Sequence, residues 1–324
     1  MKIQKIYTYP IKGIRATELN ETVVTKHGFP YDRRYMLLQV EEGGGYKNMA
    51  IGHYPAMARY FPSINIPEDG DALNGTITIA YKPPNAEGTT FDIPLVPRTD
   101  GLEEVEVTMH KSPTKAYKMA QQYNEQFSSC FGFECILVYL GTDMRRVLMT
   151  TSGNKQASES GWLSSMTSRA TQLVMGNNEQ GEKITFADCA PYLVVSEKSM
   201  DDVHHRLQDG EPYDIVKFRP NIIVSGADQA WEEDFWGELS IGGDTKIVCD
   251  HNCGRFRLVL RAVSSPKTPD DPLPGAVFTD IASYLVLLKH VDFLEGTELK
   301  LTCCSWKRDR SSWHRRSGQY AQEA

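Results

Sequence analysis

The sequence predicts a β-rich α+β fold in two lobes. In the first 110 residues, short runs of β-branched and aromatic residues recur between glycines and prolines, which is typical of a small barrel or sandwich. A stretch rich in Ser, Thr, Gly and Asn at 150–182 is expected to be a loop or lid at the boundary between the lobes. Strand-like sequence resumes at Ile184, so a second lobe is expected beyond it.

The first half is expected to consist mainly of strands. Apolar or alternating runs bounded by Pro and Gly predict them at 3–9, 21–25, 34–40, 62–66, 75–81, 91–96 and 105–109. Three glycines at 43–45 predict a hairpin turn.

A helix is expected after these strands. Ser112 and Pro113 have the order of an N-cap and a first helical residue, and apolar residues up to Phe131 share one helical face. Gly132 is expected to end the helix, and a strand is predicted at 134–140.

The second half predicts a strand ending at Ser196, a helix over 197–207 and a strand at 222–224. An acidic and aromatic loop and a Gly-Gly turn at 242–243 follow. The segment 275–290 fits either a helix or a strand. The expected units are 1–110, a connecting region at 111–182, a second domain at 183–302, and a disordered polar tail at 303–324.

Composition excludes several classes of function. The chain has 324 residues and a net charge of −7, whereas nucleic-acid binding needs a concentrated basic face. It has no apolar run of the length that a membrane-spanning helix needs, so no membrane anchor is expected. The seven cysteines lack a framework spacing, which favours reduced thiols in the cytoplasm.

Residues 218–256 carry the main chemical signal. Arg219 and Asn221 flank the rigid Pro220 and can present fixed donors to an anionic group. Cys253 can provide a thiolate for a soft metal centre. A zinc site at Cys249 and Cys253 is not favoured, because no second ligand pair at zinc spacing accompanies them. Taken alone, the segment predicts an anion site with a metal nearby.

These residues also resemble a known family. The runs FRPNI at 218–222, EEDFW at 232–236 and NCGR at 252–255, with FADCAPYLVVS at 186–196, are similar to the MOSC domain. YPIKG at 9–13 and DRRY at 32–35 resemble the N-terminal β-barrel domain that precedes MOSC in two-domain proteins, among them the mitochondrial amidoxime-reducing components. The resemblance implies two β-barrel domains with flanking helices.

The resemblance further implies a site for the molybdenum cofactor, molybdopterin. It assigns cofactor contacts, by position, to Lys12, Arg33, Arg219, Asn221 and Arg255. Asp188 is expected to orient the pterin or a metal-bound species, which makes it a candidate catalytic residue. Surface charges at strand ends are the alternative interpretation of the Lys12 and Arg33 side chains.

The thiolate position departs from the family pattern. The family binds molybdenum through the second Cys of a Cys-x-Arg-Cys motif, and Phe256 stands there in this chain. Cys253 is the candidate replacement, as metal ligand and catalytic residue; Cys249 is a second candidate. The alternatives are a centre without a protein thiolate and the loss of redox chemistry. Cys189 is expected to be a buried apolar residue, with a reactive thiol as the alternative.

The function implied is an oxidoreductase that acts on N-oxygenated or related small molecules, with electrons from a haem or flavin protein. The alternative is a non-redox or metal-free derivative: an enzyme of specialised metabolism, a cofactor carrier, or an inactive binding protein. The MOSC resemblance also associates the chain with pyridoxal phosphate binding.

Overall fold

The computed structural model describes residues 1–146, 183–206, 218–241, 245–253, 285–292, 299–302 and 306–307. Strands dominate these residues, together with two α-helices, α1 (Gln121–Phe131) and α3 (Glu197–Arg206). The predicted β-rich α+β fold is therefore confirmed. No helix among the described residues combines the length and apolar character that crossing a membrane requires.

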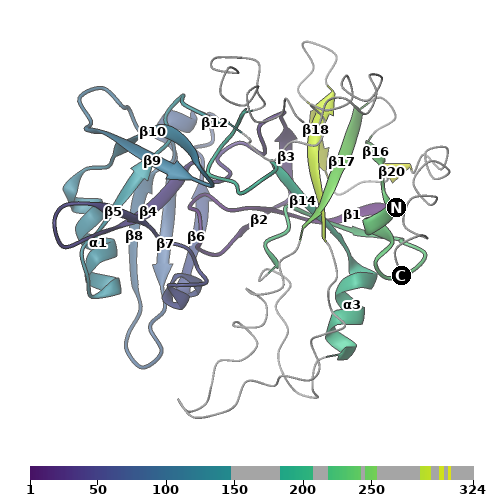
Figure 1. The fold of residues 1–324 in the computed structure, drawn as a ribbon, viewed down its shortest axis with the longest axis horizontal. Coiled ribbons are helices and arrows are strands. Elements are labelled where there is room, and N and C mark those ends of the chain that lie inside the picture. Colours follow the sequence, from purple (N-terminus) through teal and green to yellow (C-terminus); the bar gives the residue numbers. More distant parts are fainter. Residues whose placement is uncertain are drawn as a thin grey trace, which may run out of the picture.

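The N-terminal lobe contains two antiparallel sheets (Figure 1). The first has the order β5-β4-β11-β10-β9 and the second the order β6-β7-β8. Their bounds are β4 (Tyr35–Val40), β5 (Tyr46–Asn48), β6 (Tyr60–Asn65), β7 (Thr76–Tyr81), β8 (Thr89–Pro94), β9 (Glu104–Met109), β10 (Ser112–Lys118) and β11 (Cys135–Tyr139). One apolar cluster, which includes Leu37, Ile77 and Phe127, joins both sheets and α1.

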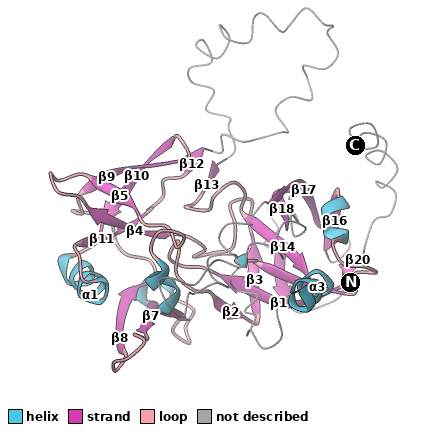
Figure 2. Ribbon diagram, turned by 60° about the horizontal axis from the view of Figure 1, so that its bottom comes forward, coloured by secondary structure: helices cyan, strands magenta, loops and turns pink. Residues whose placement is uncertain are grey.

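The C-terminal lobe is organised around a sheet of eight strands in the order β2-β1-β15-β14-β18-β17-β16-β20. Their bounds are β1 (Lys2–Thr8), β2 (Thr17–Leu19), β14 (Tyr192–Ser196), β15 (Ile222–Ser225), β16 (Glu238–Ile241), β17 (Thr245–Cys253), β18 (Leu285–Asp292) and β20 (Trp306–Lys307). Figure 2 shows α3 beside this sheet and α1 beside the other lobe.

The sheets do not follow the expected segment boundaries. β1 and β2 belong to the first 110 residues but pair within the C-terminal sheet, where β1 is antiparallel to β15. β3 (Glu21–Val24) likewise pairs with β19 (Leu299–Thr302). β10 and β11, expected in a connecting region, complete an N-terminal sheet. The lobes are therefore joined by exchanged strands.

The helix predicted from Ser112 is wrong at its start. Residues 112–118 form β10, which pairs with β9, and α1 begins only at Gln121. The Ser-Pro pair satisfies local helix-start preferences, but β9 offers a complete antiparallel partner with alternating burial. Pro113 lies opposite Thr108, where β10 is not bonded to β11, so its missing N–H is tolerated.

The structure decides some of the remaining predictions. For 275–290 either a helix or a strand is expected; the described part of this segment, 285–290, is a strand and belongs to β18, which covers 285–292. β20 lies inside the segment expected to be a disordered tail and pairs with β16, so that prediction is wrong for these two residues. The loop at 150–182, the turn at 242–243 and most of the tail lie outside the described residues.

Apolar side chains on three neighbouring strands pack together in the eight-stranded sheet. Ile222 of β15 is fully buried and lies opposite Ile6 on one side and Val194 on the other. All three belong to one core cluster. Since β1 comes from the N-terminal segment, this cluster ties the chain's beginning to its second half.

We expect Ile222→Ala to lower the free energy of unfolding by about 2–5 kcal/mol, because it leaves a cavity between three strands. Ile66→Ala, at a side chain that is 46% exposed, is the control and should change it by less than about 0.5 kcal/mol. Urea denaturation measures both. Equal effects would contradict the assignment of Ile222 to the core.

A 3₁₀ turn, η6 (Glu232–Phe235), buries acidic side chains against β14. Glu233 accepts hydrogen bonds from the Ser196 N–H at 3.0 Å and the Ser196 hydroxyl at 2.9 Å. Asp234 Oδ1 is buried and has no hydrogen-bond partner among the described residues. Burial, and then the neighbouring Glu233, raise the pKa of Asp234 from its usual 3.8 to about 7. This carboxyl therefore holds its proton in the folded state under mildly acidic conditions.

The raised pKa of Asp234 predicts a pH dependence of stability. Between pH 3.8 and about pH 7 the unfolded chain releases this proton and the folded chain keeps it, so the free energy of unfolding falls as the pH rises through this window. Asp234→Asn should remove that contribution, whereas the exposed Glu87→Gln should leave the profile unchanged. Urea denaturation at pH 5 and at pH 8 measures the effect. The same change in the free energy of unfolding between these two pH values in the native protein and in Asp234→Asn would contradict it.

Candidate functional site

The loop after β1 fixes Lys12 at the junction of the lobes. The Lys12 N–H donates to Tyr35 O at 2.8 Å, and the Tyr35 N–H donates to Pro10 O at 3.0 Å, so the loop is fastened to the start of β4. Gly13 has φ +89°, and a Cβ there would lie 2.4 Å from Met57 Cε. Left-handed backbone strains any residue with a side chain, and a Cβ would displace the end of the Met57 side chain, so glycine is favoured at this position.

The Lys12 ammonium lies in a charged and largely desolvated setting. Its Nζ donates to Asp188 Oδ1 at 2.5 Å and to Phe186 O at 3.1 Å, and its side chain is only 15% exposed. Burial is the main cause that lowers the pKa of Lys12; Asp188 opposes this shift, and Arg33 and Arg219 add to it. Among the described residues the ammonium has two acceptors, so one of its three N–H groups remains for a ligand.

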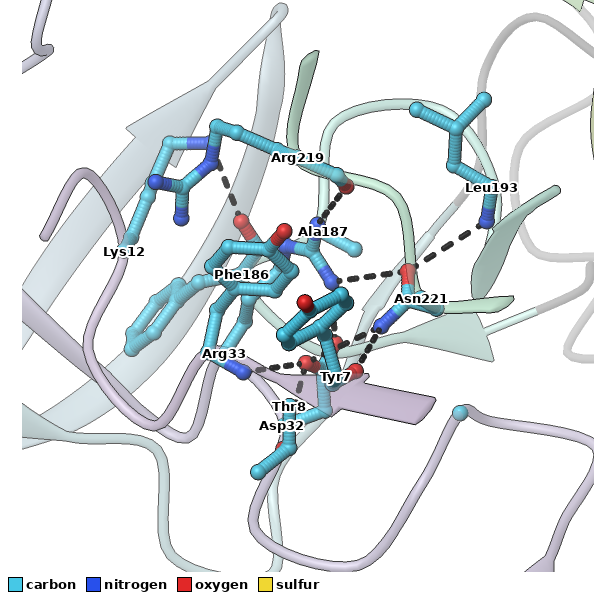
Figure 3. A network of polar contacts seen from close by, with 12 residues as sticks. Tyr7, Thr8, Lys12, Asp32, Arg33, Phe186, Ala187, Leu193, Arg219 and Asn221 are labelled. Atoms are coloured by element: carbon cyan, nitrogen blue, oxygen red, sulfur yellow. Dashed lines mark hydrogen bonds and ion pairs between the residues drawn. The ribbon is translucent and has the colours of Figure 1, made fainter. Parts of the chain in front are cut away.

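Asp32, Arg33 and Asn221 form a buried network between the lobes (Figure 3). Asp32 Oδ2 pairs with Arg33 Nη1, and Asp32 Oδ1 accepts from the Tyr9 N–H at 2.8 Å. Asn221 bridges the pair: its Oδ1 accepts from Arg33 Nη1 at 3.2 Å, and its Nδ2 donates to Asp32 Oδ1 at 3.3 Å. The exposed fractions are 1%, 5% and 1%, so these side chains hold the site's frame and are shielded from solvent.

Arg219 extends the network toward the loop after β1. Its Nη1 donates to Ile14 O at 2.6 Å. The guanidinium carbons of Arg219 and Arg33 lie 4.2 Å and 4.7 Å from the centroid of the Tyr9 ring, which is within cation–π range. The Tyr9 hydroxyl donates to Pro220 O at 3.0 Å. One aromatic ring thus spaces two arginines that would otherwise repel each other.

Two residues of this region were not predicted. Arg145, in β12 (Arg145–Arg146), is 1% exposed, and its Nη2 donates to Ala187 O and, at 2.7 Å, to Asp188 O. β12 pairs with β13 (Lys183–Ile184), which leads into the same segment. His110 Nε2 lies 3.3 Å from Asp188 Oδ1. No local sequence signal distinguishes either residue. The pairing of β12 with β13 brings Arg145 to the site, and the β9–β10 hairpin brings His110 there.

Backbone strain coincides with these side chains. Six non-glycine residues of the described chain have positive φ, and three of them are Arg33, Arg219 and His110, at +50°, +62° and +49°. Such conformations cost about 1–3 kcal/mol each and persist where the surroundings impose them. The fold therefore holds these three side chains in directions that relaxed backbone would not give.

The cysteines differ in burial and therefore in their suitability as metal ligands. Cys249 is 3% exposed and packs in the apolar cluster of the C-terminal sheet, which disfavours it as a metal ligand. Cys189 is half-buried against a second cluster. Cys253 is the last residue of β17, opposite Leu285; Arg255 and Phe256 lie outside the described residues.

The donor set fits an anionic ligand. Four cationic side chains and two carboxylates gather here: Lys12, Arg33, Arg145 and Arg219, with Asp32 and Asp188. The positive excess, in a chain of net charge −7, suits a phosphate-bearing group such as that of molybdopterin. No group of three or more His, Cys, Asp and Glu residues in the described chain is arranged to hold a metal ion. The fit therefore concerns the anionic part of the cofactor.

Asp32→Asn tests the buried network. The substitution removes the charge that compensates Arg33, and we expect it to lower the free energy of unfolding by about 3–5 kcal/mol. Asp92→Asn is the matched control, because Asp92 is exposed and accepts one hydrogen bond from Thr78; its effect should stay below about 1 kcal/mol. Comparable losses in the two variants would contradict the central role of Asp32.

Comparison with known proteins identifies two domains. Residues 1–134 match the MOSC N-terminal beta barrel domain, and residues 181–272 match the MOSC domain. The chain is 24% identical to the molybdenum cofactor sulfurase of Oryza sativa over 310 residues, which are 91% of this chain and 33% of that protein. It is 26% identical to the mitochondrial amidoxime-reducing component 1 of Mus musculus over 285 residues, 84% of this chain and 70% of the relative.

A shorter match is closer in sequence. The mitochondrial amidoxime reducing component 2 of Bos taurus is 36% identical over 77 residues, which are 24% of this chain and 22% of the relative. The chain thus spans about a third of the rice sulfurase and about a fifth of the bovine protein. The two matched segments contain the motifs at 9–13 and 218–222. The chain belongs to the MOSC-domain proteins, with a MOSC N-terminal beta barrel domain ahead of its MOSC domain.

Proposed function

We propose that the protein binds the molybdenum cofactor at the junction of its lobes and acts as an oxidoreductase on N-oxygenated or related small molecules. The observation that carries this proposal is the desolvated Lys12 ammonium between Asp188 and two arginines. The name of one relative, molybdenum cofactor sulfurase, supports the cofactor, and the name of another, amidoxime-reducing component, supports the reaction class.

Binding of an anion follows from the electrostatics of Lys12. Its remaining N–H group and the guanidinium of Arg219 lie where little water competes, and a charge-assisted hydrogen bond is stronger in such a setting. Burial is the main cause that lowers the pKa of Lys12, and Arg33 and Arg219 lower it further. An anion would offset the repulsion between Lys12 and these two arginines. Arg33 and Asn221 contribute their charge and position, and Arg255 is assigned a further contact by its place in the motif.

The bound cofactor would supply two-electron redox chemistry, and the chain's residues would position it. Arg145 holds the backbone of Asp188 through the carbonyl oxygen, so the carboxylate faces Lys12 in a fixed direction. Cys253, at the end of β17, is the residue we propose as metal ligand and catalytic thiolate. Electrons would come from a haem or flavin protein.

A cytoplasmic location belongs to the same proposal. Among the described residues, Cys130, Cys135, Cys189 and Cys249 form no disulfide bond, which favours a reducing compartment. Pyridoxal phosphate shares a phosphate group with molybdopterin but stays a prediction that no observation favours.

A second candidate function is a metal-free cofactor carrier, or another non-redox derivative. Phe256 favours it, because a phenyl ring at the family's thiolate position cannot coordinate molybdenum. This candidate retains the anion site and dispenses with redox turnover.

Metal and pterin analysis tests the proposal, on protein purified from a host that makes molybdenum cofactor. We expect near-stoichiometric molybdenum and pterin. Lys12→Ala should weaken retention of both about 10–100-fold, because a charge-assisted hydrogen bond contributes roughly 1.5–3 kcal/mol. Lys115→Ala is the matched control: this lysine is 64% exposed and pairs with Glu104 on the surface, so its variant should retain the native content.

Three outcomes separate the candidates. Pterin without molybdenum would overturn the redox proposal and support the carrier. Neither component, in native protein that unfolds cooperatively in urea, would overturn both. Equal retention by Lys12→Ala and Lys115→Ala would show that the cofactor binds elsewhere.

A further inference from the structure

The tip of the β9–β10 hairpin reaches across to the segment of Asp188. His110 and Lys111 form its two-residue turn between the paired Met109 and Ser112, and their φ angles are +49° and +65°. Turns of this kind favour Asn and Gly, because both central residues need left-handed backbone. Lysine is unfavourable in such a turn, whereas His is among the residues that tolerate left-handed backbone. The turn therefore holds the imidazole at a fixed place at the tip of the hairpin.

The contact is with the carboxylate of the candidate site. Asp188 Oδ1 lies 3.3 Å from His110 Nε2 and 2.5 Å from Lys12 Nζ, so one oxygen joins both groups. Side-chain exposure falls from 50% at His110 to 39% at Asp188 and 15% at Lys12. The three groups form a path from solvent to the desolvated ammonium.

We propose that His110 is the catalytic acid that delivers protons to the substrate, with Asp188 as its positioning residue. This inference rests on the proposed function and adds a residue to it. Reductive cleavage of an N-hydroxyl group consumes two electrons and two protons: R–NH–OH + 2e⁻ + 2H⁺ → R–NH₂ + H₂O. The N–O bond breaks, the leaving oxygen departs as water, and the nitrogen gains a hydrogen. The donor protein would supply the electron pair, and the cofactor, when bound, would provide the two-electron redox chemistry.

The geometry suits His110 to this step better than its neighbours. Arginines such as Arg145 do not release protons in proteins. Lys12 donates to two acceptors, and its third N–H is the one proposed to bind the cofactor anion. An imidazole exchanges protons near neutral pH. Nε2 lies beside Asp188 Oδ1, so we assign delivery of the proton to the other ring nitrogen, Nδ1, and the half-exposed ring is open to solvent. The charged groups around the ring are Asp188, then Lys12 behind it, and Lys111 in the same turn.

His110→Asn is the primary test in the cofactor-loaded protein. Asn tolerates left-handed backbone, so the turn is preserved while the acid is lost. We expect kcat to fall about 10²-fold, in the range of general acid catalysis, with molybdenum and pterin content unchanged. Added imidazole should restore part of the activity in His110→Ala. Lys111→Asn, in the same turn and also exposed, is the matched control and should keep native kcat.

A measurement without cofactor keeps the inference separate from the proposed function. In cofactor-free protein, Asp188→Asn should shift the ring nitrogen resonances of His110 in ¹⁵N NMR spectra and leave those of the exposed His53 unchanged. Unshifted His110 resonances would overturn the dyad whether or not the protein binds molybdenum. In loaded protein, native kcat in His110→Asn, or loss without imidazole rescue, would overturn the catalytic role.

Discussion

The buried ion pair of Asp32 and Arg33, bridged by Asn221, is the constraint on which the rest of the structure depends. The pair comes from the N-terminal lobe and the amide from the segment that leads into β15. Apolar packing is tolerant of small displacements, whereas a buried charge left without its partner costs several kcal/mol. This network therefore fixes one relative position of the lobes. Because the site contains residues from both lobes, its geometry is fixed as well.

The same network explains why strained backbone survives at the site. Arg33 is held at φ +50° by its own N–H bond to Tyr9 O and by the bond from the Phe186 N–H to its carbonyl oxygen. Arg219 is held by Ile14 O and by the ring of Tyr9. The surrounding core maintains conformations that an isolated loop would abandon. Ligand binding then needs little further ordering, which reduces its entropic cost.

Much of the fold was predictable from sequence because its signals are local. β7 and β9 of the N-terminal lobe alternate in burial. The motif residues Lys12, Arg33 and Asn221 could be named from their short runs. The helix start at Ser112 failed because its strand partner β9 outweighs the capping preference. Arg145 and His110 could not be found from sequence. They meet the Asp188 segment across separations of 43 and 78 residues, and no pattern encodes such a contact.

The placement of β1 has a consequence for the order of folding during synthesis. One edge of β1 pairs at once with β2, but its other edge pairs with β15, and Gln4 contacts Ser225 across a separation of 221 residues. The ribosome therefore releases the strand long before its second partner exists. Until then an apolar strand edge is open to chaperones or to other nascent chains. The N-terminal lobe can assemble from its own strands in that interval, and the C-terminal sheet closes later around β1, which was made well before its partner β15.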